Sequence, residues 1–333
     1  MKKLLKPKKP LTVLCMLCAV SLLASGFSKY TSALGENPYK DVSEDKWYYE
    51  TVQKANELGI MTGTADDLFA PELPMTREMF VTALYRMAQI GVANEGAFLF
   101  EYDDVNYNNK NKWYYYPVVW ATDMGVTLGI DENNFGVGMP VTREQISTFI
   151  YRYLNNRFIA VSVPLAKEPA GAFTDAPSAF AKDAVECMRL TGIVNGVGND
   201  KFAPKSTATR AEAAAMLCRL YEASKDAVYS FNFETDRYDE IRISANTGDQ
   251  VREKSITDKS QIALTLEYMN TISITSSREE NGINPYEYSF TLFDNSRNDY
   301  IFAFGFTDLG AVMHKGRIYE TNMMLPFKEY LNS

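Results

Sequence analysis

Histidine and cysteine, the residues most often used for metal binding and covalent catalysis, are scarce in this sequence. Its 333 residues include one histidine, His314, and four cysteines. One histidine cannot make a histidine-rich metal site, and the sequence contains no HExxH pair, phosphate-binding loop or nucleophile elbow. We therefore expect no metal, no cofactor and no catalytic residue, and we interpret His314 as a solvated turn residue.

Long apolar runs are also lacking, apart from one near the N-terminus. The basic segment MKKLLKPKKP precedes LTVLCMLCAVSLLA, which is short for a membrane span, and small and polar residues follow. This order predicts a secretory signal peptide over residues 1–33, with an uncleaved N-terminal anchor helix as the alternative. After cleavage we expect no stable membrane span. Cys187 and Cys218 then remain, either as one disulfide or as two buried free thiols.

Positive charge is in deficit. The formal net charge is −8 at pH 7, and loss of the six lysines of residues 1–33 makes the mature chain −14. A protein that binds nucleic acid needs clustered basic surface to release counterions, so we expect no nucleic-acid partner. The mature chain of about 300 residues is long enough for two or three domains.

The sequence does contain an internal repeat. Its clearest landmark is a Thr-Arg pair that recurs at intervals of 66 and 67 residues, as Thr76-Arg77, Thr142-Arg143 and Thr209-Arg210. The same two intervals relate Trp47, Trp113 and Phe180; Gly59, Gly125 and Gly192; Gly63, Gly129 and Gly196; Phe69, Phe135 and Phe202; and Arg86, Arg152 and Arg219. Such a period is typical of repeat architectures. We place the repeats at residues 38–90, 99–156 and 171–223, with connectors between them.

Each repeat is predicted to form two helices joined by a loop. In the first repeat, apolar residues at helical spacing lead to Gly59, which stands where a C-terminal cap is expected. The threonines of the Thr-Arg pairs suit the N-caps of the second helices. Gln145 and Glu212 complete a capping box in repeats 2 and 3, whereas Met79 cannot do so in repeat 1. Because one helical hairpin buries little apolar surface, we expect all three to form one all-α bundle.

These motifs resemble the S-layer homology domain of bacterial cell-surface proteins. The matching elements are the openings YKDV and YDDV, the tryptophans, the stretches GIMTG, GVTLG and GIVNG, the segments TREM, TREQ and TRAE, and the endings LYR, IYR and LCR. The resemblance covers roughly residues 38–223. It implies a three-fold bundle that attaches a secreted protein non-covalently to secondary cell-wall polysaccharide, often through pyruvylated sugar. The third repeat has Phe180 in place of tryptophan, so its site is expected to bind differently or not at all.

The arginine of each Thr-Arg pair stands in the first turn of a helix, where the helix dipole disfavours a cation. We interpret this placement as an anion site, in which free helix N–H groups and the guanidinium grip a carboxylate such as that of a ketal-linked pyruvate. The alternative is an arginine that pairs with an acidic residue of a neighbouring repeat. The tryptophans either stack on a sugar ring or fill the core between repeats. The predicted polysaccharide-binding residues are Arg77, Arg143, Arg210, Trp47, Trp113, Thr76, Thr142 and Thr209.

A change of pattern near residue 228 predicts a small α+β domain over residues 228–333. Alternating apolar residues around Ile241 and a turn at residues 246–248 predict paired strands. A helix is predicted after the cap residue Asp258, with Leu264 among its core residues. YEYSFTLF and YIFAFGFT predict a hairpin, GRIYETN a strand and LPFKEYLN a short helix.

Two functions remain open for this C-terminal module. In the first, the repeats display it on the wall, where it binds or senses an unidentified protein or ligand. In the second, it is a wall-anchored polysaccharide hydrolase whose carboxylate pair comes from Glu279, Glu280, Glu287 or Asp294. Glycoside hydrolysis requires two acids that converge in a cleft, and nothing in their spacing shows this. We favour the first function and predict no enzymatic activity.

Overall fold

The computed structural model describes residues 37–88, 102–156, 159–246, 251–279, 288–294, 299–306, 312–314 and 317–321. The predicted signal peptide over residues 1–33 and the predicted helix LPFKEYLN lie outside the described residues. Glu280 and Glu287 also lie outside them.

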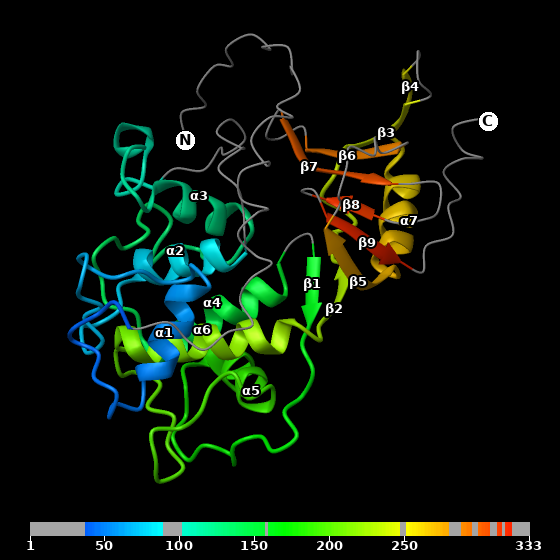
Figure 1. Cartoon of the computed structure of the whole chain (residues 1–333). Helices are drawn as coiled ribbons and strands as arrows, with labels where there is room; N and C mark the ends of the chain where they lie inside the picture. Colours follow the sequence, from blue (N-terminus) through cyan, green and yellow to red (C-terminus); the bar gives the residue numbers. More distant parts are fainter. Residues whose placement is uncertain are drawn as a thin grey trace. The chain divides into compact units, whose positions relative to one another are not determined.

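Each repeat contains the two predicted helices (Figure 1). They are α1 (Tyr49–Glu57) and α2 (Arg77–Met87) in repeat 1, α3 (Tyr115–Asp123) and α4 (Arg143–Leu154) in repeat 2, and α5 (Lys182–Leu190) and α6 (Arg210–Ser224) in repeat 3. The short 3-10 turns η2 (Tyr107–Asn109) and η3 (Ala179–Ala181) precede α3 and α5. Gly59, Gly125 and Gly192 follow the first helices with φ of 66°, 74° and 71°, the left-handed conformation of a C-terminal cap, as predicted.

The apolar core is shared by all three repeats, which confirms the predicted all-α bundle. The loop phenylalanines Phe69, Phe135 and Phe202 are completely buried, one in each repeat. The rings of Phe80 in α2 and Phe149 in α4 stack at 6.1 Å across two repeats. Burial of each such side chain contributes about 1.5–3 kcal/mol, so contacts between repeats add to the stability of each repeat.

A closed ring of backbone hydrogen bonds lies where the three repeats meet. Its members are the buried residues that precede the Thr-Arg pairs, namely Met75, Val141 and Ala208. The N–H of Met75 donates to Ala208 O at 2.9 Å, that of Ala208 to Val141 O at 3.0 Å, and that of Val141 to Met75 O at 2.8 Å. Each repeat therefore both donates to and accepts from a neighbour, which gives the bundle its three-fold character.

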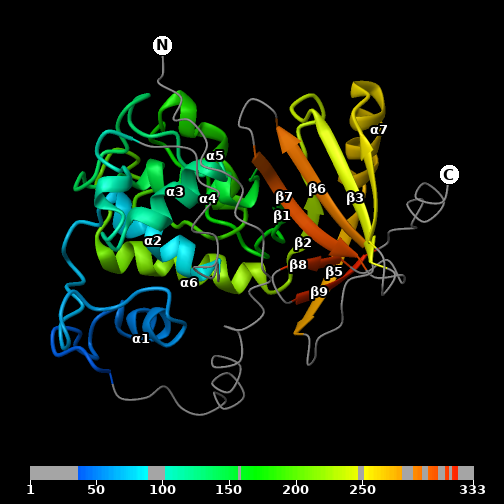
Figure 2. The same ribbon diagram turned by 90° about the horizontal axis from the view of Figure 1, so that it is seen from above.

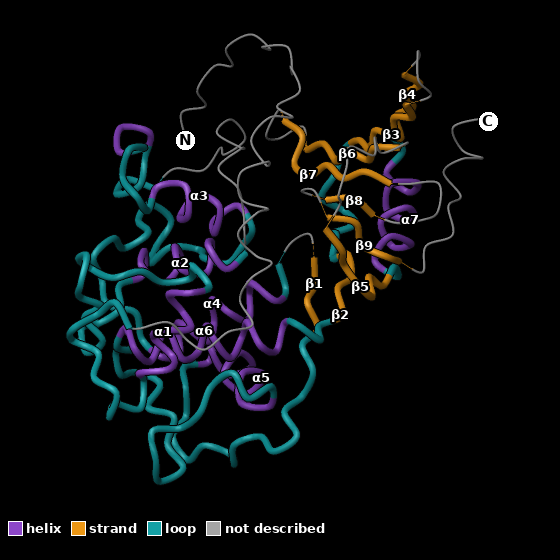
Figure 3. The backbone as a smooth tube through the Cα atoms, in the orientation of Figure 1, coloured by secondary structure: helices purple, strands orange, loops and turns teal. Residues whose placement is uncertain are grey.

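The C-terminal module is an antiparallel sheet with one helix (Figure 3). Its strands are β2 (Val228–Phe231), β3 (Glu240–Asn246), β4 (Val251–Ile256), β5 (Ser273–Glu279), β6 (Tyr288–Asp294), β7 (Asp299–Phe306), β8 (Val312–His314) and β9 (Arg317–Thr321). Together with β1 (Ile159–Ser162), the described strands are ordered β1-β2-β5-β9-β8-β7-β6-β3-β4. Helix α7 (Lys259–Asn270) lies against one face of this sheet (Figure 2).

Most predictions for the module are confirmed. Asp258 caps α7 by accepting a hydrogen bond from Gln261 N at 2.9 Å, and β6 and β7 pair as the predicted hairpin. Ile243 of β3, Phe290 of β6 and Leu266 of α7 form part of its core. Leu264 was assigned wrongly to this core, because its side chain is 66% exposed on the outer side of α7.

Strand β1 was not predicted. It lies in the connector between repeats 2 and 3, yet it pairs with β2 at the edge of the C-terminal sheet. A segment from inside the repeat region is therefore part of the module that was expected to begin near residue 228.

Candidate functional site

The three arginines of the Thr-Arg pairs join the repeats in a ring. Each one donates its Nε–H to the backbone oxygen of the loop phenylalanine in the next repeat, and its guanidinium lies over the ring of that phenylalanine. The bonds run from Arg77 to Phe135 (2.9 Å), from Arg143 to Phe202 (2.8 Å) and from Arg210 to Phe69 (2.8 Å), with guanidinium-to-ring distances of 5.0, 4.9 and 4.7 Å. We refer to these places as the Arg77, Arg143 and Arg210 interfaces.

The loops that supply these phenylalanines also cover the helix starts. The first helical N–H groups donate to loop carbonyls of the next repeat: Arg77 N to Met139 O (3.0 Å), Arg143 N to Ser206 O (3.0 Å) and Arg210 N to Leu73 O (2.9 Å). The expectation that these N–H groups are free to bind an anion is therefore wrong. The neighbouring loop satisfies them in the way that an N-terminal helix end requires.

Burial makes the arginine charges costly. Arg77, Arg143 and Arg210 are 3%, 4% and 5% exposed. Desolvation lowers the pKa of each guanidinium, although arginine stays protonated in proteins. A buried cation needs hydrogen-bond acceptors, so the number of acceptors at each interface decides how much binding capacity is left.

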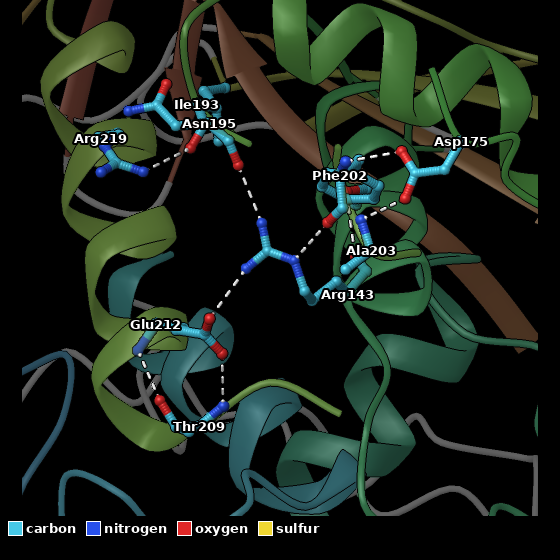
Figure 4. Close-up of polar contacts among 10 residues, drawn as sticks. Arg143, Asp175, Ile193, Asn195, Phe202, Ala203, Thr209, Glu212 and Arg219 are labelled. Atoms are coloured by element: carbon cyan, nitrogen blue, oxygen red, sulfur yellow. Dashed lines mark hydrogen bonds and ion pairs between the residues drawn. The ribbon is translucent and has the colours of Figure 1, made fainter. Parts of the chain in front are cut away.

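Arg143 has acceptors on all three of its nitrogens (Figure 4). Besides Phe202 O at Nε, Nη1 donates to Glu212 Oε1 at 3.2 Å and Nη2 to Asn195 O at 2.9 Å. The alternative of an arginine that pairs with an acidic residue of a neighbouring repeat therefore describes Arg143. Arg210 is intermediate, because Nη2 donates to Thr62 O at 2.8 Å while Nη1 has only the weak acceptor Met79 Sδ at 4.0 Å.

Arg77 differs from both. Within the described residues, its only side-chain hydrogen bond is the one from Nε to Phe135 O. Its Nη2 is buried and has no partner. The guanidinium lies near two aromatic rings, 5.0 Å from that of Phe135 and 5.1 Å from that of Phe149. Arg77 therefore keeps donor capacity that Arg143 has used on the protein itself.

The threonine caps show the same asymmetry. Thr142 and Thr209 form complete capping boxes with Gln145 and Glu212, as predicted. The hydroxyl of Thr76 is buried without a partner, because it does not accept the cap hydrogen bond that the hydroxyls of Thr142 and Thr209 accept. Two adjacent residues, Thr76 and Arg77, thus carry polar atoms that the described part of the protein does not satisfy.

The aromatic residues before the first helices are exposed. Trp47, Trp113 and Phe180 are 62%, 53% and 58% exposed, so they do not fill the core between repeats. The interpretation of these tryptophans as core residues is wrong, and their faces are open to solvent.

The surroundings of each aromatic place it near the arginine of the preceding repeat. Ser178, close to Phe180, donates its N–H to Glu144 Oε2 at 2.8 Å beside Arg143. Burial and the nearby carboxylates of Glu78 and Asp104 raise the pKa of Tyr114, which follows Trp113 and so belongs to the Arg77 interface. Within repeat 1, burial and the carboxylate of Glu72 raise the pKa of Tyr48, which follows Trp47. Glu72 precedes Leu73, whose carbonyl accepts from Arg210 N, so Trp47 belongs to the Arg210 interface. The interface without tryptophan is thus that of Arg143, although Phe180 and Arg210 share a repeat.

One aspartate in each repeat holds the phenylalanine loop. Asp41, Asp104 and Asp175 accept backbone N–H bonds at Phe69, Phe135 and Phe202 with lengths of 2.9, 2.8 and 2.7 Å. The sequence analysis identified the openings that contain two of these aspartates but gave them no role. The recurrence of an aspartate at the start of each repeat was the sequence signal from which this role could have been predicted.

Elsewhere, the described residues offer little for catalysis. No group of three His, Cys, Asp or Glu side chains among them is placed to hold a metal ion. Glu279 ends β5 and Asp294 ends β6, four strand positions apart, which is about 19 Å along the sheet. The two strand ends are therefore far apart in the sheet.

Comparison with known proteins agrees with the repeats. The family described as the S-layer homology domain matches residues 38–78, 108–146 and 172–214. The chain is 26% identical over 229 residues to an endoglucanase of Bacillus sp. (strain KSM-635), covering 65% of this chain and 23% of the relative. It is 36% identical over 97 residues to a cell surface protein of Thermoanaerobacter kivui, covering 29% and 12%. With an S-layer protein of Bacillus thuringiensis subsp. finitimus it shares 22% identity over 198 residues, covering 59% and 23%.

The chain spans less than a quarter of the length of each of these relatives. In the part of the chain that the structure describes, no helix combines the length and apolar character needed to cross a membrane. The three matched segments lie within the three structural repeats, and two S-layer proteins are among the relatives. This chain therefore contains three tandem S-layer homology domains and is associated with the cell surface.

Proposed function

We propose that the three S-layer homology domains anchor this chain non-covalently to secondary cell-wall polysaccharide after export, and that a negatively charged substituent such as a pyruvylated sugar binds at the Arg77 interface. The observation that carries the proposal is the state of Arg77, a buried cation with one protein acceptor on its side chain. A carboxylate at this interface would satisfy the remaining donors by charge-assisted hydrogen bonds.

The neighbouring residues suit the same ligand. Trp113 offers an exposed ring beside the interface, and the unpaired hydroxyl of Thr76 is adjacent in sequence to Arg77. Among the predicted binding residues, Trp47, Thr209 and Arg210 then form a second, weaker site, because Nη1 of Arg210 has only a thioether partner. Arg143 and Thr142 would serve mainly as structure, since each of the three side-chain nitrogens of Arg143 already has an acceptor.

The C-terminal module is proposed to act in display rather than in catalysis. Among the relatives, an endoglucanase and an S-layer protein each share less than a quarter of their length with this chain. The catalytic name of one relative therefore does not transfer to residues 228–333.

The proposal is tested by titrating the purified full chain with wall polysaccharide, before and after mild-acid removal of its pyruvate ketals. We expect Trp113→Ala to weaken binding by about 1 kcal/mol, roughly fivefold in Kd, without lowering the melting temperature. Phe180→Ala should have less effect. Tyr107→Ala is a matched control, because Tyr107 is an exposed aromatic that pairs with Lys110. Equal binding of both polysaccharide preparations, or unchanged Kd for Trp113→Ala, would overturn the proposal.

A further inference from the structure

Two helices of the anchor are each followed in the sequence, within four residues, by one of two neighbouring strands of the C-terminal sheet. Helix α4 carries Arg143 at its start, and β1 follows it after residues 155–158. Helix α6 carries Arg210 at its start and leads through residues 225–227 to β2. The two strands pair antiparallel along their whole length, from Ile159 opposite Phe231 to Ser162 opposite Val228.

Further contacts secure this junction. Asn232 Nδ2 donates to Asn156 O at 2.8 Å, and a backbone bridge joins Asn155 and Ala160. At the end of β2, the side chain of Asn270 in α7 accepts from Phe233 N at 2.7 Å and donates to Phe233 O at 2.9 Å. Strand β2 is thus held by β1 from the repeat region on one side, and by β5 and α7 of the module on the other.

We infer that β1 is a latch strand, by which the wall anchor and the C-terminal sheet unfold as one cooperative unit. A module attached only through residues 225–227 would reorient freely on a short linker, and such motion is the default for domains with small interfaces. The β1–β2 ladder adds a second attachment from inside the repeats. Without it, β2 would become an exposed sheet edge with unpaired N–H and C=O groups.

Through the latch strand, binding of wall polysaccharide to the bundle would also stabilise the C-terminal sheet. A ligand that binds only the folded bundle stabilises it by mass action, and a cooperative junction passes this stabilisation to the sheet. The transfer of ligand stabilisation to the sheet rests on the polysaccharide binding proposed above. The shared unfolding of bundle and sheet does not require a ligand, so the two are tested separately.

Calorimetry of the full chain without ligand tests the latch. We expect one unfolding transition, whose calorimetric and van't Hoff enthalpies agree. The double variant Ala160→Pro/Val161→Pro removes two consecutive ladder N–H groups, one of which must face β2, and should split the transition into two. Leu165→Ala, at a connector position that is 70% exposed, is the control and should leave one transition. Two independent transitions in the unmodified chain would overturn the latch.

A cross-linked variant covers the case in which the proline variant does not fold. Ser162 and Val228 are opposite each other in the ladder, at a spacing that a disulfide tolerates. Oxidised Ser162→Cys/Val228→Cys should keep the single transition and raise its temperature, and reduction should reverse the shift. Added wall polysaccharide should raise the whole transition in the unmodified chain but only the bundle transition in the proline variant. A sheet transition that ignores both the cross-link and the ligand would contradict the inference, whereas failure of the ligand arm alone would count against the proposed polysaccharide binding.

Discussion

Arg210 donates its Nε–H to the backbone oxygen of Phe69, a residue 141 positions earlier in the chain. This hydrogen bond connects the last repeat to the first. With the equivalent bonds of Arg77 and Arg143, it closes a ring in which every repeat holds the next. Each arginine of the Thr-Arg pairs therefore joins two repeats, whether or not it also binds a ligand.

Arg143→Ala is expected to destabilise the bundle by roughly 1.5–3 kcal/mol, because it leaves the buried acceptor Phe202 O and the partly buried acceptors Asn195 O and Glu212 Oε1 without their donor. Chemical denaturation followed by circular dichroism measures this change. Arg86→Ala is the control, since Arg86 makes only a long, exposed contact of 3.4 Å to Thr62. Equal stability of the two variants would contradict a structural role for Arg143.

Met79→Glu is expected to stabilise repeat 1 by about 1 kcal/mol. A glutamate here completes the capping box with Thr76 and faces Arg210, as Glu212 does with Thr209 and Arg143 in the next interface. The readout is the melting temperature of the full chain. Met79→Leu keeps the apolar contact without the cap and should change it little, so a gain in the leucine variant would exclude the capping explanation.

Ala203→Gly is expected to raise the free energy of unfolding by about 0.5–1 kcal/mol, because Ala203 has a φ of 56° in the left-handed region. Repeat 2 already has glycine at the equivalent position, Gly136, with φ of 90°. Gly136→Ala is the reciprocal variant and should destabilise, since an added Cβ would lie 2.9 Å from Ile130 Cγ2. Urea titrations of both variants give the signs, and a loss of stability in Ala203→Gly would contradict the strain.

Acid should weaken the Phe202 loop through Asp175. Partial burial acts to raise the pKa of Asp175, but hydrogen bonds from the N–H groups of Phe202 and Ala203 bring it overall below its usual value of 3.8. The pKa of Asp175 is thus lower in the folded state than in the unfolded state. Its carboxylate therefore stabilises the protein fully above the unfolded-state pKa, and this contribution is lost as the pH falls through the folded-state pKa.

Thermal melts of Asp175→Asn and the unmodified chain measure this effect. At pH 7 the unmodified chain should melt at the higher temperature, and the difference should shrink as the pH falls below the usual aspartate pKa of 3.8. A difference that is the same at both pH values would show that the carboxylate charge does not act.

The two described cysteines are free thiols, which removes the disulfide alternative. Burial raises the pKa of Cys218 to about 11, and it also raises that of Cys187. At pH 8 the Cys218 thiol is therefore protonated and should resist iodoacetamide until the protein unfolds. Peptide mass spectrometry after timed labelling separates the two sites. Fast native labelling of Cys218 would show that this part of α6 opens readily.

The repeat pattern was sufficient to predict the elements but not their partners. The period located the helices, and the residue three positions after each threonine correctly distinguished the capping boxes of Thr142 and Thr209 from the incomplete one at Thr76. A period states which residues are equivalent, not which repeat faces which. The assignment of Phe180 to the Arg143 interface therefore needed the structure.

Short-range patterns also failed where the chain makes distant pairs. Strand β1 has four residues, and its partner β2 begins at Val228, so local alternation gave no signal for it. The free N–H groups expected at the helix starts were lost to loop carbonyls such as Met139 O, which come from another repeat. Leu264 fitted a helical pattern but lies on the solvent side of α7.

The backbone ring of Met75, Val141 and Ala208 has no first or last member. Every N–H and every C=O in it already has its partner, so a duplicated fourth repeat would find no place at the axis. A gene rearrangement that changes the order in which the three repeats are translated would preserve the ring, provided that the connectors reach. The count of repeats in this anchor is thus constrained by its backbone hydrogen bonds, whereas their order along the chain is not.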